Sequence, residues 1–133
     1  MPSITSLTLK SDLNELDRVV NFVRQLADKC DIDQDTEHRI LLVLSEAVTN
    51  AIVHGNRKEI SKTVNIKVVF DQKTIFLTVC DQGSGFDPDR IPDPRTKENL
   101  LKTGGRGVWL IQEIADETQY SENGTRIDIR INL

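Results

Sequence analysis

A glutamate and an asparagine stand four residues apart, at Glu46 and Asn50. On a helix, this spacing places both side chains on one face. The amide oxygen of Asn50 is a hard ligand suited to magnesium, and the carboxylate of Glu46 can accept a proton from an attacking hydroxyl. His54 lies four residues further along the same face and is a weaker binding candidate, because packing at the helix end also explains it. A solvated face without chemistry is the alternative for all three.

Two glycine-containing segments can complete a nucleotide site. Asp81 follows an apolar run and precedes Gly83 and Gly85. A carboxylate at this place can accept a hydrogen bond from the exocyclic amino group of adenine, which the keto group of guanine cannot offer, so ATP is favoured over GTP. Gly105 and Gly107 lead into an apolar helical pattern, and the free N–H groups at a helix start favour phosphate. Taken singly, each segment can also be an ordinary tight turn.

The elements that must position these residues follow from hydrophobic periodicity. A β-prone stretch at residues 4–9 precedes Ser11, which is predicted to cap a first helix. Helically spaced apolar residues predict that this helix covers 13–27. A polar break at 31–35 then separates it from a second helix, which carries Glu46 and Asn50 and ends near Gly55.

Strict alternation of apolar and polar residues predicts the strands. Residues 64–70 and 75–79 read as an antiparallel hairpin with a turn at 71–73. A second hairpin turn is predicted at 123–124, before a strand over 127–133. Because each strand has one apolar face, helices should cover one side of the sheet and water the other.

Between the two hairpins, residues 87–103 carry three of the four prolines and many charges, which predicts a mobile loop with a helical hint at 98–101. A last amphipathic helix is predicted over 108–115. The expected fold is therefore an α/β (α+β) two-layer sandwich with a mixed, mostly antiparallel sheet. Residues 1–133 are predicted to form a single domain.

Composition narrows the setting of this site. With 133 residues, 38% hydrophobic and 29% charged, the chain resembles a soluble globular domain. Its net charge is −4 and its basic residues are scattered, so nucleic acid is not expected as a partner. Cys30 and Cys80 lack metal-binding spacing, which favours reduced, buried thiols. Without an apolar signal core or a membrane-spanning run, a cytoplasmic location and no membrane partner are predicted.

Together, the candidate residues resemble the sequence boxes of the histidine-kinase-like ATPases, a family shared by sensor kinases, type II topoisomerases, a heat-shock chaperone and mismatch-repair proteins. The resemblance rests on Glu46-x-x-x-Asn50, Asp81-x-Gly83-x-Gly85, Gly105-x-Gly107 and Gly124-Thr125. Within the family, residues 45–55 and 104–111 look like the small anti-sigma-factor serine kinases of bacterial partner switching. The chain has no room for the phosphoacceptor hairpin of a sensor kinase.

This resemblance implies a histidine-kinase-like ATPase fold that binds ATP and Mg²⁺. Glu46 would be the catalytic base, Asn50 the metal ligand and Asp81 the adenine acceptor, supported by Thr125. Residues 87–103 would form a lid. The substrate would be a serine or threonine of an anti-sigma-factor antagonist, the competing partner a sigma factor, and the assembly a homodimer. The cofactor-binding residues expected on this basis are Asn50, His54, Asp81, Gly83, Gly85, Gly105, Gly107 and Thr125.

Two features depart from the family pattern. Trp109 occupies a position where the family has a smaller residue, and the prolines of residues 87–103 form their own pattern. Neither removes a catalytic part. Since phosphoryl transfer depends mainly on positioning and charge neutralisation, an ATP-binding partner switch without significant kinase activity stays open as the alternative.

Overall fold

Apolar residues that alternate along five segments form one antiparallel sheet. The computed structural model describes residues 3–83 and 110–133. Within them the strand order is β1-β2-β3-β5-β4, and all four pairings are antiparallel. The strands are β1 (Ser3–Lys10), β2 (Thr63–Asp71), β3 (Thr74–Cys80), β4 (Glu117–Ser121) and β5 (Arg126–Asn132). Both predicted hairpins are confirmed, since β2 pairs with β3 and β4 with β5.

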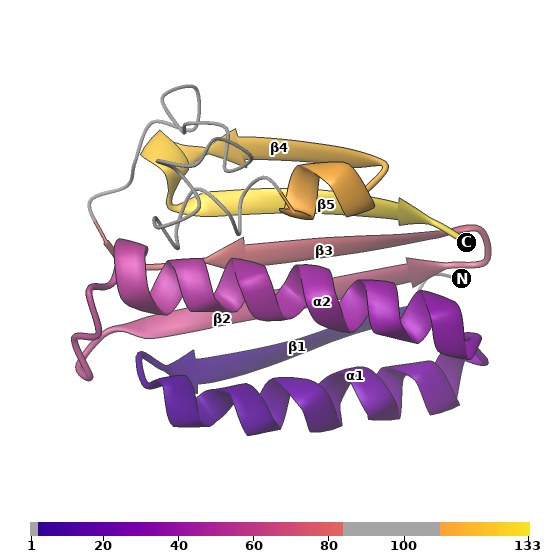
Figure 1. The fold of residues 1–133 in the computed structure, drawn as a ribbon, viewed down its shortest axis with the longest axis horizontal. Coiled ribbons are helices and arrows are strands. Elements are labelled where there is room, and N and C mark those ends of the chain that lie inside the picture. The colour runs from indigo at the N-terminus through magenta and orange to yellow at the C-terminus, as the bar shows by residue number, and fades with distance from the viewer. Residues whose placement is uncertain (1–2, 84–109) are drawn as a thin grey trace, which may run out of the picture.

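Two long helices lie side by side on one face of the sheet (Figure 1). They are α1 (Leu16–Cys30) and α2 (Gln34–Asn50), and α2 continues as a π-helical turn, η2 (Ala51–Gly55). The helix therefore ends at Gly55, as the sequence pattern predicts. The two-layer sandwich with helices on one face is confirmed.

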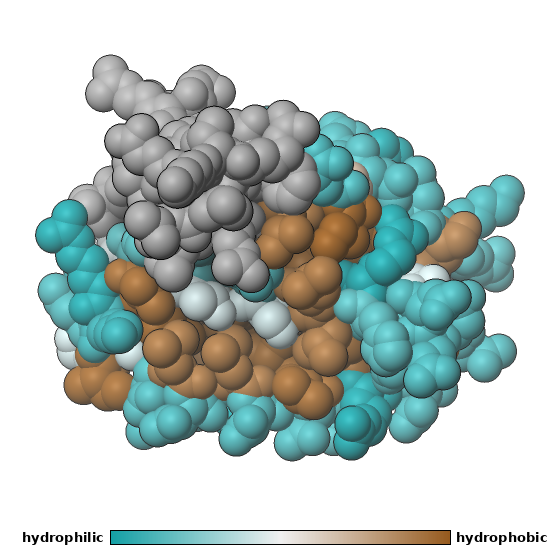
Figure 2. All heavy atoms as spheres, in the orientation of Figure 1, coloured by the Kyte–Doolittle hydropathy of each residue, from teal (hydrophilic) through white to brown (hydrophobic). Residues whose placement is uncertain are grey.

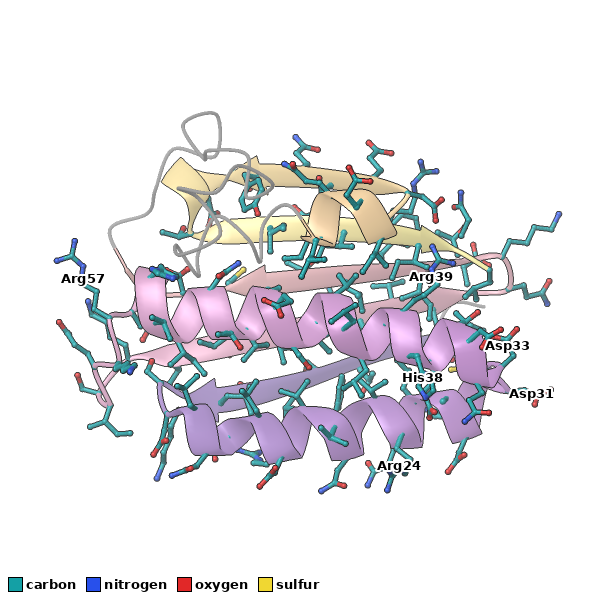
Figure 3. The ribbon with its side chains drawn as sticks, in the orientation of Figure 1. Arg24, Asp31, Asp33, His38, Arg39 and Arg57 are labelled. Atoms are coloured by element: carbon teal, nitrogen blue, oxygen red, sulfur yellow. The ribbon has the colours of Figure 1, made fainter. Side chains whose placement is uncertain are left out.

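The start of α2 is fixed by side-chain chemistry at the junction with α1. Asp31 adopts a left-handed conformation, with φ of 53°, and ends α1. The Asp33 carboxylate then accepts a hydrogen bond from the backbone N–H of Thr36 at 2.8 Å, and so caps α2 (Figure 3). Asp31 and Asp33 thus turn the chain from one helix into the next, as the polar break predicts.

The prediction that Ser11 caps the first helix is wrong. A short 3₁₀ turn, η1 (Leu13–Glu15), precedes α1, and its cap is Asp12, which accepts from the N–H of Asn14 at 2.9 Å. Ser11 is buried instead, and its hydroxyl donates to the carbonyl oxygen of Lys62 at 2.9 Å. A hydroxyl used in this long-range bond is not available to a helix end.

The core fills the space between the helices and the sheet. Burying these side chains supplies the main favourable term for folding. From the sheet it includes Leu9, Val64, Ile66, Val68, Ile75, Leu77, Val79, Ile127, Ile129 and Ile131, and from the helices Val19, Val23, Ile40, Leu44, Val48 and Ile52. Cys30 and Cys80 are both free and only partly buried, and burial raises the pKa of each thiol.

The last amphipathic pattern is described in part. Residues 110–114 are helical, and Ile111 is fully buried in the core. Arg39 of α2 holds this segment by donating to the carbonyl oxygen of Ile114 at 3.0 Å (Figure 3). The predicted loop at 87–103 lies outside the described residues. In the described part, no helix is long and apolar enough to cross a membrane.

The outer surface of the helix layer is not uniformly polar. Figure 2 shows a band of apolar residues along this face of the molecule. Leu13 of η1 and Leu42 of α2 are among the exposed large hydrophobic side chains. The opposite face of the sheet also exposes apolar side chains, at Ile4 and Phe76.

Candidate nucleotide site

A cavity lies where the C-terminal end of α2 meets strands β3, β4 and β5. Asn50 and Thr125, both predicted from the sequence, line it together. Its walls are mostly apolar, as expected of a site that receives a flat aromatic base. The lining residues are Ala47, Asn50, Ala51, Val79, Ile111, Tyr120, Gly124, Thr125 and Ile127.

Asp81 lies beside this cavity, at the end of β3. Its backbone N–H donates to the carbonyl oxygen of Thr125 at 2.8 Å, which joins the two predicted adenine-contacting residues across neighbouring strands. The Asp81 carboxylate accepts from the N–H of Gly83 at 2.8 Å and is half-buried. Burial raises the pKa of this carboxyl above its usual value, against the opposing effects of the Gly83 hydrogen bond and the positive charge of Lys62.

Gly55 and Gly83 provide the space in which Asp81 sits. A Cβ atom added to Gly55 would overlap the Asp81 carboxylate, and one added to Gly83 would overlap the carbonyl oxygen of Gly55. Any side chain at either position would separate the helix end from the turn that follows β3. Gly55 therefore does more than end a helix, since it lets Asp81 approach the backbone closely.

The π-helical turn η2 sets the place of Gly55. The N–H of Asn56 donates to the carbonyl oxygen of Ala51 at 2.7 Å, five residues back, so the backbone is wider here than in an α-helix. Such turns occur frequently at functional sites. The widened end brings Gly55 against Asp81, although the two residues are far apart in the sequence.

The remaining residues of the predicted helix face are placed differently. Glu46 is half-buried on α2, one helical turn before Asn50, and it does not line the cavity of the described residues. His54 is exposed on η2 and also does not line that cavity. The roles of Glu46 and His54 stay predictions, and Gly85, Gly105 and Gly107 lie outside the described residues.

Thr125 is positioned by a tight 3₁₀ turn, η5 (Glu122–Gly124). Its hydroxyl donates to the carbonyl oxygen of Glu122 at 2.8 Å. Gly124 has a φ of 86°, which a side chain would strain, and it is buried against the cavity. The predicted hairpin turn thus also forms part of the site wall.

Two further residues near the site have only weak signals in the sequence. Tyr120 of β4 lines the cavity, and burial raises its pKa to about 12. A single tyrosine on a strand before a hairpin turn does not by itself indicate a site. Asn56 is completely buried next to Gly55. Its only signal is an amide directly after a helix-ending glycine, which is also common in ordinary turns.

Comparisons with known proteins show which family the sequence resembles. Residues 9–131 match the family model described as histidine kinase-like ATPase domain. A protein named anti-sigma F factor from Anoxybacillus flavithermus is 37% identical over 117 residues, which cover 84% of this chain and 77% of the relative.

Two further relatives carry the same name. The one from Geobacillus thermodenitrificans is 40% identical over 102 residues, covering 74% of this chain and 66% of the relative. The one from Bacillus velezensis is 32% identical over 120 residues, covering 86% and 80%. The match to the family model spans the helices and strands that form the candidate site. This chain belongs to the histidine kinase-like ATPase family.

Proposed function

We propose that this protein is an ATP-dependent protein serine/threonine kinase that acts as an anti-sigma regulatory factor in the cytoplasm. It phosphorylates an anti-sigma-factor antagonist and sequesters a sigma factor, with residues 1–133 acting as one domain. The observation that carries the proposal is half-buried Asp81, whose backbone N–H bonds to Thr125 at the edge of a cavity that Asn50 lines. Family membership supports ATP as the ligand, and the names of the relatives support a sigma factor as the partner.

The residue types that line the cavity suit an adenine nucleotide. Val79, Ile111 and Ile127 form apolar walls against which a base can pack. The Asp81 carboxylate accepts a hydrogen bond from the adenine amino group, and the glycine contact at Gly55 keeps that carboxylate close to the backbone. Guanine presents a carbonyl oxygen to the same carboxylate, so GTP binds more weakly.

The phosphate end of the site begins at Asn50. In the described part of the chain, no three His, Cys, Asp or Glu side chains gather to hold a metal ion. The Asn50 amide oxygen would hold a magnesium ion at this place, together with phosphate oxygens and water. When bound, magnesium neutralises charge on the phosphates. The sequence predictions that Gly85, Gly105 and Gly107 donate backbone N–H groups to the phosphates, and that residues 87–103 form a lid, concern residues outside the described part of the chain.

Glu46 acts on the hydroxyl of the protein substrate. Its carboxylate accepts the hydroxyl proton as the serine oxygen forms a bond to the γ-phosphorus. The bond between that phosphorus and the β,γ-bridging oxygen breaks, and ADP leaves with the electron pair. His54 is exposed on η2, one helical turn beyond Asn50, and its contact with the nucleotide remains part of the proposal.

One observation favours the alternative of an ATP-gated binding module. Among the described residues, Glu46 does not line the cavity that Asn50 and Thr125 share. If its carboxylate stays away from the substrate hydroxyl, nucleotide binding can still switch partners without transferring phosphate. The kinase proposal and the binding-module proposal use the same adenine pocket. They differ only in whether Glu46 accepts the proton of the substrate hydroxyl.

Incubating the protein with Mg-ATP and an antagonist-type domain tests the kinase proposal. Mass spectrometry should detect one added phosphate on a serine or threonine of the antagonist. Glu46→Gln should slow transfer by about 10²–10⁴-fold, because the proton acceptor is lost, while ATP affinity measured by calorimetry stays unchanged. Glu37→Gln is the matched control, because Glu37 lies nine residues earlier on α2, about 14 Å along the helix.

Three results have distinct meanings. Absent phosphate transfer by the unmodified protein, or equal transfer by Glu46→Gln, refutes the kinase proposal. Partner binding that tracks the nucleotide with no phosphoprotein formed supports the module. Binding to neither nucleotide nor partner refutes both.

We also propose that the protein forms a homodimer through the open face of its sheet. An apolar stripe crosses this side of the sheet. It consists of three register neighbours on β1, β2 and β3, namely Ile4, Val69 and Phe76. Ile4 is 63% exposed and Phe76 44% exposed. The next two residues of the row, Arg130 and Glu117, form an ion pair at 2.9 Å. In a dimer with two-fold symmetry, the apolar stripe of one copy packs against the same stripe of the second copy, and both stripes become buried.

A further inference from the structure

Asn56 joins four segments of the chain at the base of the candidate adenine site. It is the residue directly after Gly55, and none of its surface is exposed. A buried amide is costly unless each of its polar atoms finds a partner. Its position after the end of a helix does not explain why the polar Asn56 side chain is buried.

Every polar position of the Asn56 side chain is used. Its Oδ1 accepts from the backbone N–H of Gln82 at 2.7 Å. Its Nδ2 donates to the hydroxyl oxygen of Ser11 at 2.7 Å and to the carbonyl oxygen of Thr63 at 2.9 Å. The orientation of the amide is unambiguous, because the Gln82 N–H can only donate and the Thr63 carbonyl can only accept.

The contact to Gln82 matters because Gln82 is the middle of the turn that carries Asp81. The turn is held on one side by Asn56, and on the other by the Gln82 side chain, whose Oε1 accepts from the N–H of Thr63 at 2.7 Å. Asn56 is itself fixed through its N–H bond to Ala51 in η2. The adjacent Gly55 packs under the Asp81 carboxylate.

We propose that Asn56 is a positioning residue for nucleotide selection: its side chain locks the Asp81–Gly83 turn to the helix end, so that the Asp81 carboxylate points at the adenine amino group. This inference rests on the proposed role of Asp81. A rigid acceptor discriminates between adenine and guanine more strongly than one free to turn aside, because the wrong base then leaves it unpaired. Asn56 does not touch the nucleotide and acts only through the turn.

A nucleotide-free measurement tests the lock directly. Amide hydrogen exchange by NMR should show that Asn56→Ala loses protection at Gln82 and Gly83 by about tenfold or more, relative to the amides of the β4–β5 hairpin. Asn56→Asp should restore protection at Gln82, because a carboxylate oxygen can still accept its N–H, even though the buried charge lowers global stability. Unchanged protection at the turn in Asn56→Ala overturns the proposal.

Calorimetric titration with ATP and with GTP tests the consequence. Asn56→Ala should raise the Kd for ATP by about tenfold and reduce the preference for ATP over GTP. Ser11→Ala is the matched control, because Ser11 is buried in the same network but does not touch the turn. It should lose global stability and keep the ATP preference.

The outcomes separate this inference from the proposed function. A wild-type preference for ATP that survives Asn56→Ala, or that Ser11→Ala also abolishes, overturns the positioning role alone. A wild-type protein with no preference for ATP overturns both the adenine role of Asp81 and this inference, whatever the exchange data show. If Asn56→Ala does not fold, Asn56→Ser replaces it in both measurements, since its short hydroxyl retains polarity but lacks the amide.

Discussion

At the scale of a single residue, Asp81 combines its proposed role in binding adenine with a cost in folding stability. Its carboxylate is half-buried against Gly55, and desolvation of the charged form raises its pKa. A group whose folded-state pKa exceeds its unfolded value favours the folded state only while it is protonated. At neutral pH the ionised Asp81 therefore destabilises the fold, which is common for residues selected for function rather than stability.

The first prediction concerns Asp81→Asn. The neutral amide can keep the hydrogen bond from Gly83 but carries no charge to desolvate, so the urea midpoint at pH 7 should be higher than in the wild type. The gain should be complete above the raised folded pKa and should disappear as the pH falls below the ordinary aspartate pKa of 3.8, where the wild-type group is protonated in both states. A less stable Asp81→Asn at pH 7 contradicts this account.

The same variant should bind ATP more weakly. Replacing a charged acceptor by an amide should raise the Kd for ATP by about 10- to 100-fold. Together, higher stability and lower affinity separate a binding carboxylate from a structural one. An unchanged or tighter ATP affinity rules out the adenine role of Asp81.

At the scale of elements, the site depends on how the end of α2 meets the turn after β3. The π-helical turn η2 presents Gly55 to Asp81, and Gly83 packs on the carbonyl oxygen of Gly55. Neither element forms the site alone. No side chain separates Gly55 from Gly83. The Asp81 carboxylate, at the end of β3, can therefore lie beside the end of the helix that carries Asn50.

A double-mutant cycle at this contact gives the next prediction. Gly55→Ala should cost about 1–3 kcal/mol in the wild-type background, because its Cβ overlaps the Asp81 carboxylate. In an Asp81→Ala background the same change should cost much less, since the overlapping atoms are gone. Urea unfolding of the four proteins measures the coupling. Equal costs in both backgrounds would show that Gly55 is needed for another reason.

At the scale of the whole molecule, the described residues form a sheet with one face covered by helices and one face left open. The open face carries the apolar stripe of Ile4, Val69 and Phe76, which crosses three neighbouring strands. A single exposed hydrophobic side chain is ordinary on a protein surface, but a continuous row of three is a candidate interface. The nucleotide site lies on the other side of the sheet, among the helices.

The prediction at this scale is that Phe76→Lys weakens the homodimer. A charge placed at the β3 end of the stripe should raise the dimer dissociation constant by about tenfold or more, as measured by sedimentation. Ile60→Lys is the matched control, because Ile60 is 60% exposed but lies in the connection before β2. A monomeric wild-type protein, or equal weakening by both variants, contradicts dimerisation through the sheet face.

Local pattern predicts the elements of this protein well. The period-2 runs became β2, β3 and β5, and the helical runs became α1 and α2, because a strand or helix needs an apolar face of its own period to bury. The roles of Asn50 and Asp81 were predicted from residue type and spacing, whereas that of Thr125 was implied only by the family resemblance. Asn50 and Thr125 both line the cavity, and the backbone N–H of Asp81 bonds to Thr125.

Contacts between distant segments could not be predicted in this way. Ser11 was expected to cap a helix, but its hydroxyl bonds to Lys62 and Asn56, which only the packing of β1 against β2 brings near. Gly55 could be recognised as a helix end, but not as the surface on which Asp81 rests. The sequence by itself determined the strands, the helices and the chemical groups of the site, since these depend on neighbouring residues. The tertiary structure alone decided which backbone and side-chain groups meet, because close approach and buried hydrogen bonds arise only when separate elements pack together.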